Sequence, residues 1–376
     1  MDDLKNKPGI MLVLPDLEYG DVAYYCVDLA IALNEFGFRP VVVSAGGILL
    51  KELIRVNITH VQLPVNSCDF FKIYNNIKAI TKIITDMNIS VVHVNSRAAG
   101  LSCLYACKRT GAKLVTTVHS IYKTRLYFLN KIFDRAIIKS HSIIMPSLYV
   151  ANYMVKYYNL ESNKISIIHK WINPKFFSSE AISTERIVNI ANTLAIPEDK
   201  RLISVIESNA KMSDLSLLID SISELKRNDI AVFIMWNKNM NKSHLINKIK
   251  LMKMNDYINI IDHDIDAQAV YSLSDVVINL SSKYDVFNLE MLKVESIGRV
   301  IISTDQGASK EIIADGKTGK IIQLNTHDLS SAINWALNLS DEERRHISNE
   351  ASKYVYFNFS HDSKISDVLS LYKSLL

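Results

Sequence analysis

Short apolar runs alternate with amphipathic segments along almost the whole chain, and this alternation constrains the fold more than any other feature. The runs GIMLVLP, PVVVSAG and SVVHVNS are rich in Val, Ile and Leu, and each precedes a segment with helical periodicity. Strands without polar alternation are buried on both faces, which is typical of parallel sheets covered by helices. The pattern therefore predicts an α/β fold with doubly wound sheets.

The alternation pauses in a polar stretch that ends near Lys200 and then restarts with RLISVIE. A chain of 376 residues, 48% of them apolar, is also too long for one hydrophobic core. We predict a first Rossmann-like domain at 1–175, a second at 176–355, and a C-terminal helix at 356–376 that packs back on the domains. The two domains are expected to face each other across a cleft at the carboxyl ends of their strands, where ligands usually bind.

Charge is distributed unevenly along the chain. The first 175 residues carry 21 Lys and Arg against 12 Asp and Glu, whereas the remainder carries 22 against 27. A basic half attracts phosphate-bearing or membrane-surface partners. No zinc finger, RNA-recognition signature or arginine run points to nucleic acid.

The cysteines and the N-terminal segment indicate the cellular compartment in which the protein is expected. The four cysteines lack the spacing of a disulfide framework, so a reducing cytoplasm is expected. Cys103 and Cys107 lie four residues apart on a predicted helix, where buried thiols are favoured over a metal site. The first apolar run is too short to span a membrane, and no signal peptide is expected.

Seven segments, in order and at characteristic spacing, resemble the family 4 glycosyltransferases of the GT-B fold. They are PDLEYGDV at 15–22, FRPVVVSAGG at 38–47, HVNSRAAG at 93–100, TTVHSIY at 116–122, MPSLYVANYM at 145–154, SIIHKWIN at 166–173 and STDQGASKEIIADGKTG at 303–319. The resemblance covers nearly the whole chain. It is closest to bacterial members that build lipopolysaccharide or other cell-envelope glycans.

The resemblance implies a retaining transfer of a sugar from a nucleotide diphosphate sugar to a glycolipid or polysaccharide precursor. The acceptor is expected on the first domain and the donor on the second. Negative charge grows on the departing diphosphate, so cations should hold it, and carboxylates should hold the sugar hydroxyls. The donor is a co-substrate, and neither a cofactor nor a metal is implied. The DHDID segment at 262–266 is expected near the nucleotide base.

The diphosphate clamp of the family is altered in this chain. Where relatives have a Gly-Arg pair followed by Lys-Gly, the aligned positions hold Glu207 and Ser208, then Ser213 and Asp214. Both cations are lost, and Lys211 is the local candidate for a substitute. Losing one charge-assisted contact with a leaving group costs about 3 kcal/mol, or ~100-fold in rate.

The family's pair of glutamates, separated by seven residues, is altered as well. Asp285 stands at the first position and can still reach a sugar hydroxyl. Lys293 stands at the second and cannot accept hydrogen bonds from a ribose diol. Glu290 and Glu295 are near in sequence and are interpreted as solvated helix charges.

Other donor-side positions match the family in part. Gly20 keeps one glycine of the N-terminal Gly-Gly loop, but Asp21 replaces the second. Phe287 is retained, with Asn288 in place of the glycine that usually follows. Gly307 keeps one glycine of a second pair and is expected to let the donor approach the backbone.

Several polar residues follow predicted strands, where cleft residues belong. Ser96 and Arg97 follow the fourth strand, and His119 ends the next. The resemblance implies that His119 faces the transferred sugar or its acceptor, and that Glu311 and Asp285 approach the donor sugar as catalytic carboxylates. Arg97 and Ser96 are expected to bind an anionic group of the acceptor. On residue type alone, a structural role for His119 remains open.

The segment 122–140 carries five cations against one anion, with aromatic residues between them. One interpretation is that it lies on an anionic membrane surface. The other is an amphipathic helix with a basic solvent face. The first interpretation places the protein in the cytoplasm, in peripheral contact with the inner face of the membrane.

Two functional hypotheses follow. The first is a retaining glycosyltransferase whose activity is weakened by its altered donor site. The second is a catalytically silent homologue that acts as a binding or regulatory partner of another glycosyltransferase, because the losses concentrate at donor-contacting positions. A sugar phosphate isomerase of the same architecture has no sequence feature in its favour.

Overall fold

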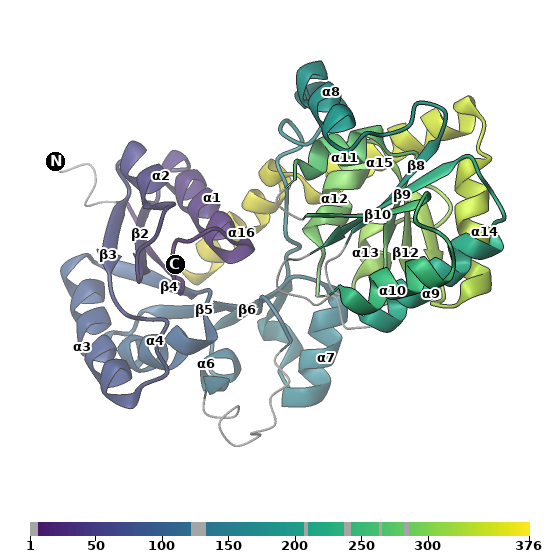
Figure 1. The fold of residues 1–376 in the computed structure, drawn as a ribbon. Helices are drawn as coiled ribbons and strands as arrows, with labels where there is room; N and C mark the ends of the chain where they lie inside the picture. The colour runs from purple at the N-terminus through teal and green to yellow at the C-terminus, as the bar shows by residue number, and fades with distance from the viewer. Residues whose placement is uncertain (1–6, 122–132, 207–209, 237–241, 263–264, 282–285) are drawn as a thin grey trace. The chain divides into compact units, whose positions relative to one another are not determined.

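A computed structural model describes residues 7–121, 133–206, 210–236, 242–262, 265–281 and 286–376 (Figure 1). The chain forms two units, Met1–Lys170 with Lys364–Leu376, and Trp171–Ser363. The first division lies upstream of the boundary expected at 175. The reason is that Trp171 stacks edge-on against His361, and the Ile172 amide donates to the Phe359 carbonyl, so this segment is tied into the second unit.

The first unit is built on a seven-stranded parallel sheet with the order β3-β2-β1-β4-β5-β6-β7. Its strands are β1 (Gly9–Val13), β2 (Arg39–Ser44), β3 (Thr59–Gln62), β4 (Ile89–Val94), β5 (Lys113–Thr117), β6 (Ser142–Met145) and β7 (Ile165–Ile167). The strand order reverses between β1 and β4, which creates a topological switch point where ligands usually bind. The central strands are buried because helices cover both faces.

The helices of this unit begin at side-chain caps in several places. They are α1 (Asp21–Glu35), α2 (Leu50–Arg55), α3 (Phe70–Asp86), α4 (Arg97–Thr110), α6 (Arg135–Ile138) and α7 (Leu148–Tyr158), with the 3₁₀ turn η1 (Ser162–Lys164). Asp69 caps α3, and Ser96 caps α4. Figure 1 shows α1 and α2 on one face of the sheet, and α3 and α4 on the other.

The second unit is built on a six-stranded parallel sheet with the order β10-β9-β8-β11-β12-β13. Its strands are β8 (Arg201–Ile206), β9 (Ile230–Trp236), β10 (Ile258–Asp262), β11 (Val276–Asn279), β12 (Val300–Thr304) and β13 (Gly319–Ile322). Its helices are α8 (Thr184–Thr193), α9 (Met212–Glu224), α10 (Ser243–Leu251), α11 (Ala267–Leu273), α12 (Leu289–Ser296), α13 (Ser309–Ile312), α14 (Thr326–Leu337) and α15 (Asp341–Phe359), with the turn η2 (Ser179–Ala181). The predicted α/β class with two doubly wound sheets is confirmed.

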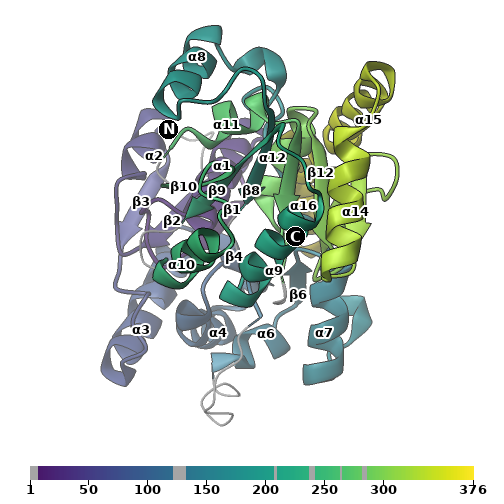
Figure 2. The same cartoon turned by 45° about the vertical axis from the view of Figure 1, so that its right-hand side comes forward.

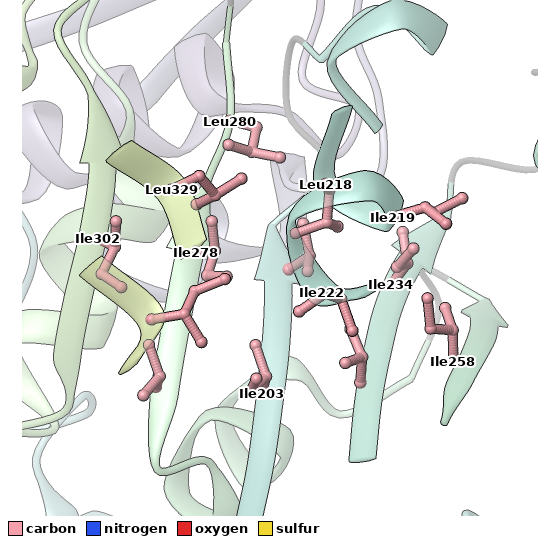
Figure 3. Close-up of a cluster of buried hydrophobic side chains, with 14 of the residues drawn as sticks. Ile203, Leu218, Ile219, Ile222, Ile234, Ile258, Ile278, Leu280, Ile302 and Leu329 are labelled. Carbon is pink, nitrogen blue, oxygen red and sulfur yellow. The ribbon is translucent and has the colours of Figure 1, made fainter. Parts of the chain in front are cut away.

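Helix α9 is held over its sheet by aliphatic side chains. Leu218, Ile219 and Ile222 meet Ile203 and Ile234 of the two strands beneath them (Figure 3). Each such fully buried side chain contributes about 1.5–3 kcal/mol relative to exposure. This packing holds the first turn of α9 at the carboxyl edge of β8. No helix in the described ranges is both long and apolar enough to cross a membrane.

The C-terminal helix expected at 356–376 begins at His361 in the structure. Helix α15 ends at Phe359, Ser360 is extended with ψ of 149°, and α16 (His361–Leu375) follows. Residues from Lys364 onward belong to the first unit. There the fully buried Tyr372 hydroxyl lies 2.5 Å from Nδ1 of His93, which anchors the helix against β4.

Candidate functional site

His119 lies at the carboxyl end of β5 and is only partly exposed. Its Nε2 is 3.0 Å from Oδ1 of Asn95, which follows β4, and the Tyr25 ring packs edge-on against it. An amide oxygen can only accept, so Nε2 carries the hydrogen and Nδ1 is the acceptor. Burial, together with the nearby positive charge of Lys170, lowers the pKa of His119 well below its ordinary value. His119 is therefore a neutral hydrogen-bond acceptor at pH 7.

A second histidine supports this arrangement from inside the sheet. Burial lowers the pKa of His93 to about 3, so its ring is neutral. Its Nε2 lies 2.6 Å from the Thr117 hydroxyl, and its Nδ1 meets Tyr372. Thr117 is the last residue of β5, two positions before His119, so the network fixes the end of that strand.

Arg97 is already engaged within the first unit. Its Nε and Nη2 donate to the two carboxylate oxygens of Asp134 at 2.6 and 3.0 Å. Asp134 also accepts a hydrogen bond from the Tyr158 hydroxyl and is only 1% exposed. The Ser96 hydroxyl caps α4 by accepting from the Ala99 amide. Both residues thus hold the start of α4, beside the edge where an acceptor is expected.

The N-terminus of α1 lies at Gly20, which is exposed and extended, with φ of 173°. A Cβ at Gly20 would meet no atom within 4 Å, so the position leaves open space for a ligand. The carboxylate of Asp21 lies 3.1 Å from Nζ of Lys170, which is 14% exposed. Lys170 follows β7 and was not singled out by sequence, although SIIHKWIN contains it. Its charge offsets the anion that Asp21 introduces.

In the second unit, Asp214 occupies the N-terminus of α9. It is 3% exposed, and its oxygens accept from the Lys211 amide at 2.8 Å and the Ser213 hydroxyl at 3.1 Å. A helix N-terminus is a ready site for a phosphate, and here the chain's own carboxylate fills it. Lys211 and Ser213 are exposed at this turn. Glu207 and Ser208 lie outside the described residues.

Lys293 makes a local ion pair. Its Nζ lies 2.5 Å from Oε1 of Glu290, whose Oε2 accepts from the Tyr271 hydroxyl at 3.0 Å. Lys293 also lies over the Phe177 ring, 5.2 Å from its centroid. Glu290 is thus paired and half-buried, so its interpretation as a solvated charge is wrong. Asp285, the aligned partner of Lys293, lies outside the described residues.

The residues around the start of α12 have structural roles. Phe287 is 3% exposed and packs on the Phe359 ring with centroids 5.7 Å apart, so it belongs to the core. The side-chain oxygen of Asn288 accepts from the Glu290 amide, and its Nδ2 donates to Asn279 at 3.2 Å. Asparagine in place of glycine is thus explained as an N-cap, although it stabilises the helix by only a few tenths of a kcal/mol relative to glycine.

Gly307 and Glu311 lie after β12. Gly307 has φ of 61°, a left-handed conformation that favours glycine. Glu311 is half-buried on α13, and its backbone carbonyl accepts from the Tyr354 hydroxyl at 3.3 Å. Glu311 thus lies near the carboxyl edge of the second sheet, and its expected approach to the donor sugar stays a prediction.

The DHDID segment was expected near the nucleotide base and not at a metal. Asp266 caps α11 and pairs with Arg186 through two hydrogen bonds of 2.7 and 2.8 Å. His263 and Asp264 of this segment lie outside the described residues. Within the ranges that the structure describes, no group of three or more His, Cys, Asp or Glu side chains could hold a metal ion.

Glu295 is fully buried, so its interpretation as a solvated charge is wrong. Its Oε1 accepts from the Thr318 hydroxyl at 2.6 Å, and Oε2 has no hydrogen-bond partner among the described residues. Burial raises the pKa of this carboxyl well above its ordinary value. Burial therefore favours the protonated form of Glu295 in the folded protein.

Glu295→Gln is expected to flatten the dependence of stability on pH. Above the ordinary pKa of a glutamate, the unfolded chain releases the proton while the folded chain must keep it, so stability falls as pH rises. The variant should gain ~1 kcal/mol or more at pH 8 relative to pH 5 in urea unfolding. Glu342→Gln, at an exposed position of α15, should leave the curve unchanged. Parallel curves for Glu295→Gln and the unmodified chain would contradict a buried neutral acid.

Two family models cover most of the chain. Residues 22–176 match Glycosyltransferase Family 4, and residues 188–354 match Glycosyl transferases group 1. The chain belongs to the GT-B glycosyltransferases. Among solved structures, a glycosyltransferase from Rickettsia africae superposes with a TM-score of 0.89 at 26% identity, covering 98% of this chain and 99% of that one.

Other relatives of this GT-B glycosyltransferase are more distant. Anabaena HepE in complex with UDP-glucose has a TM-score of 0.79 at 12% identity, over 97% of this chain and 99% of that one, and shows the shared fold. An uncharacterized glycosyltransferase of Methanocaldococcus jannaschii is 22% identical over 62% of this chain, and the match spans only 60% of that relative. Alpha-monoglucosyldiacylglycerol synthase of Acholeplasma laidlawii is 20% identical over 70% of each chain.

Proposed function

We propose that this GT-B glycosyltransferase transfers a sugar, with retention, from a nucleotide diphosphate sugar to a glycolipid or polysaccharide precursor of the cell envelope, at a weakened rate. The observation that carries the proposal is His119, a neutral acceptor held by Asn95 at the carboxyl edge of the first sheet. The complex of HepE with UDP-glucose and the lipid product named for the Acholeplasma relative support the two substrate classes.

The proposed roles follow from the chemistry of each group. His119 accepts a hydroxyl of the sugar or acceptor through Nδ1, and Glu311 with Asp285 holds sugar hydroxyls. The open backbone at Gly20 and the left-handed turn at Gly307 allow close approach of the donor. No metal or other cofactor takes part in this proposal.

In this proposal, fewer side chains contact the donor and the acceptor than the family pattern provides. Lys211 and Ser213 are exposed beside the capped start of α9 and are the available donor-side groups. Ser96 and Arg97 shape the edge that receives the acceptor. The protein is proposed to act in the cytoplasm, at the inner face of the membrane.

A second function is favoured by one specific observation. Asp214 fills the N-terminus of α9, and Lys293 is paired with Glu290, so two family donor contacts are replaced by internal ones. Such replacements are expected in a catalytically silent homologue that binds the acceptor and supports a partner glycosyltransferase.

Donor titration separates the two functions. For the weakened enzyme we expect a Kd of about 1 mM, near −4 kcal/mol, in calorimetry with uridine, guanosine and adenosine diphosphate sugars. Nucleotide release should then be measurable, and His119→Ala should abolish it, with thermal unfolding as the check that the variant is folded at the assay temperature. Absence of binding to all three donor classes would favour the silent homologue. A micromolar Kd would show that the altered clamp is not a defect.

A further inference from the structure

His93 lies on the face of the first sheet that α1 covers. Successive residues of a strand point to opposite faces, and Val92 and Val94 of β4 pack with side chains of α4. His93 therefore faces the other layer, where α1 carries Tyr25. Strand β1, which leads into α1, pairs with β4 and places Leu12 opposite His93 (Figure 2).

Two hydroxyl groups hold the His93 ring, which is fully buried. The Tyr372 hydroxyl lies 2.5 Å from Nδ1, and the Thr117 hydroxyl lies 2.6 Å from Nε2. A neutral imidazole has one N–H, so one ring nitrogen donates and the other accepts. Each hydroxyl therefore takes a role that depends on the other. Removing the Tyr372 hydroxyl removes one of the two contacts that fix the orientation and the tautomer of His93.

The Tyr25 ring contacts both histidines of this unit's carboxyl edge. It packs edge-on against His93, with ring centroids 6.4 Å apart, and against His119, with centroids 5.4 Å apart. The interplanar angles are 85° and 75°, which is the edge-to-face geometry that aromatic pairs prefer. Protein interiors leave few voids, so a side chain cannot turn without moving those packed against it. A change in the His93 ring is therefore transmitted to His119 through the Tyr25 ring.

The orientation of His119 depends on this packing because its hydrogen bond fixes only one nitrogen. Nε2 donates to Oδ1 of Asn95 at 3.0 Å, and in the proposed function Nδ1 accepts the substrate hydroxyl. Asn95 is also linked to His93, since its Nδ2 donates to the His93 carbonyl at 3.5 Å. The Tyr25 ring is the contact that opposes rotation of Nδ1 away from a substrate.

We propose that Tyr372 is a positioning residue for His119. The Tyr372 hydroxyl fixes His93, and the Tyr25 ring carries this constraint to His119. Tyr372 is fully buried and does not touch substrate in this proposal. Helix α16 thus contributes to sugar transfer through an internal contact, from the opposite end of the chain. The inference rests on the proposed function, which assigns Nδ1 of His119 to a substrate hydroxyl.

The variant Tyr372→Phe separates the hydroxyl from the docking of α16. It keeps the aromatic ring, which packs edge-on against His93 with centroids 5.8 Å apart. Ile365, Val368 and Leu369 of the same helix are at most 5% exposed and hold it in place. The helix is therefore expected to stay docked in this variant, with thermal unfolding as the check.

The first test observes the histidine rings of the full chain by nitrogen NMR, without donor or acceptor. Tyr372→Phe should change the tautomer ratio of His93 and shift the Nδ1 signal of His119. Ser374→Ala is the control, because it removes an exposed hydroxyl of α16 that donates to the Leu371 carbonyl. It should leave both signals unchanged. A His119 signal that is the same in Tyr372→Phe and the unmodified chain would overturn the proposal.

A second variant keeps the proposal testable if Tyr372→Phe is unfolded. Thr117→Val preserves the shape of the side chain and removes the other hydroxyl bonded to His93. It should also shift the His119 signal, and an unchanged signal would count against the proposal.

A double-variant comparison tests the route through Tyr25. Tyr25→Leu removes the ring and should shift the His119 signal by itself. If the ring carries the constraint, adding Tyr372→Phe to Tyr25→Leu should cause little further shift, because coupled residues are not additive. Additive shifts would show that Tyr372 does not act through Tyr25 and would overturn the proposal.

Nucleotide release from UDP-glucose supplies a kinetic readout. Tyr372→Phe should lower kcat about 10-fold with little change in KM, because a misplaced catalytic group slows the reaction while the groups that bind the donor are untouched. A raised KM with an unchanged kcat would contradict the positioning role. If the unmodified chain released no nucleotide, the proposed function would fail, whereas the NMR comparison would still decide whether Tyr372 positions His119.

Discussion

Restoring the family clamp is expected to tighten binding of UDP-glucose by ~100-fold or more. The variant combines Glu207→Gly, Ser208→Arg, Ser213→Lys and Asp214→Gly. It supplies two cations for the diphosphate and removes the carboxylate that fills the start of α9. Calorimetry measures the affinity, and nucleotide release measures whether turnover rises with it.

Asp214→Asn separates the effect of removing the carboxylate from the effect of adding the two cations. It removes the negative charge and keeps a capping oxygen, so it should give a smaller gain than the full variant. Because losing the cap costs about 1 kcal/mol, thermal unfolding must show that the full variant is folded at the assay temperature. A folded variant whose affinity does not change would show that the donor diphosphate is not held at this turn.

Arg97→Ala is expected to lower the free energy of unfolding by about 3–5 kcal/mol. It leaves the Asp134 carboxylate buried without its bidentate partner. Urea unfolding at neutral pH measures the loss. The size of this effect matters because Arg97 was expected from sequence to bind an acceptor, a role that by itself would leave stability unchanged.

Arg55→Ala provides the comparison. Arg55 also pairs with a carboxylate, that of Glu52 at 2.9 Å, but its side chain is 69% exposed. Such surface pairs contribute about 0–1 kcal/mol. If Arg97→Ala cost no more than Arg55→Ala, the pair with Asp134 would not be a structural element, and a direct role at the acceptor edge would be favoured.

The sheets and the position of His119 were predictable because they depend on local patterns. Buried parallel strands appear in the sequence as apolar runs, and the residues at their carboxyl ends lie at the same edge of the sheet. The ion pair between Glu290 and Lys293 was also predictable from the sequence, because residues three apart on a helix are neighbours. The capping role of Asp214 was predictable as well, because acidic residues are enriched in the first turn of a helix.

Partners that are distant in sequence were not predictable. Arg97 and Asp134 are 37 residues apart, and the fully buried Glu295 meets Thr318 across 23. Helical periodicity cannot show which side of α12 is covered, because the covering helix, α15, begins only at Asp341. The interpretation of Glu295 as a solvated charge failed for that reason.

The bond between Tyr372 and His93 joins residues 279 positions apart. A ribosome must therefore synthesise the entire second unit before β4 can receive its last buried partner. Chains usually fold their domains in the order of synthesis. Here the first unit begins to emerge before the second, but its packing is completed only after the second unit has been synthesised. Until Tyr372 has been synthesised, Nδ1 of His93 lacks this buried partner.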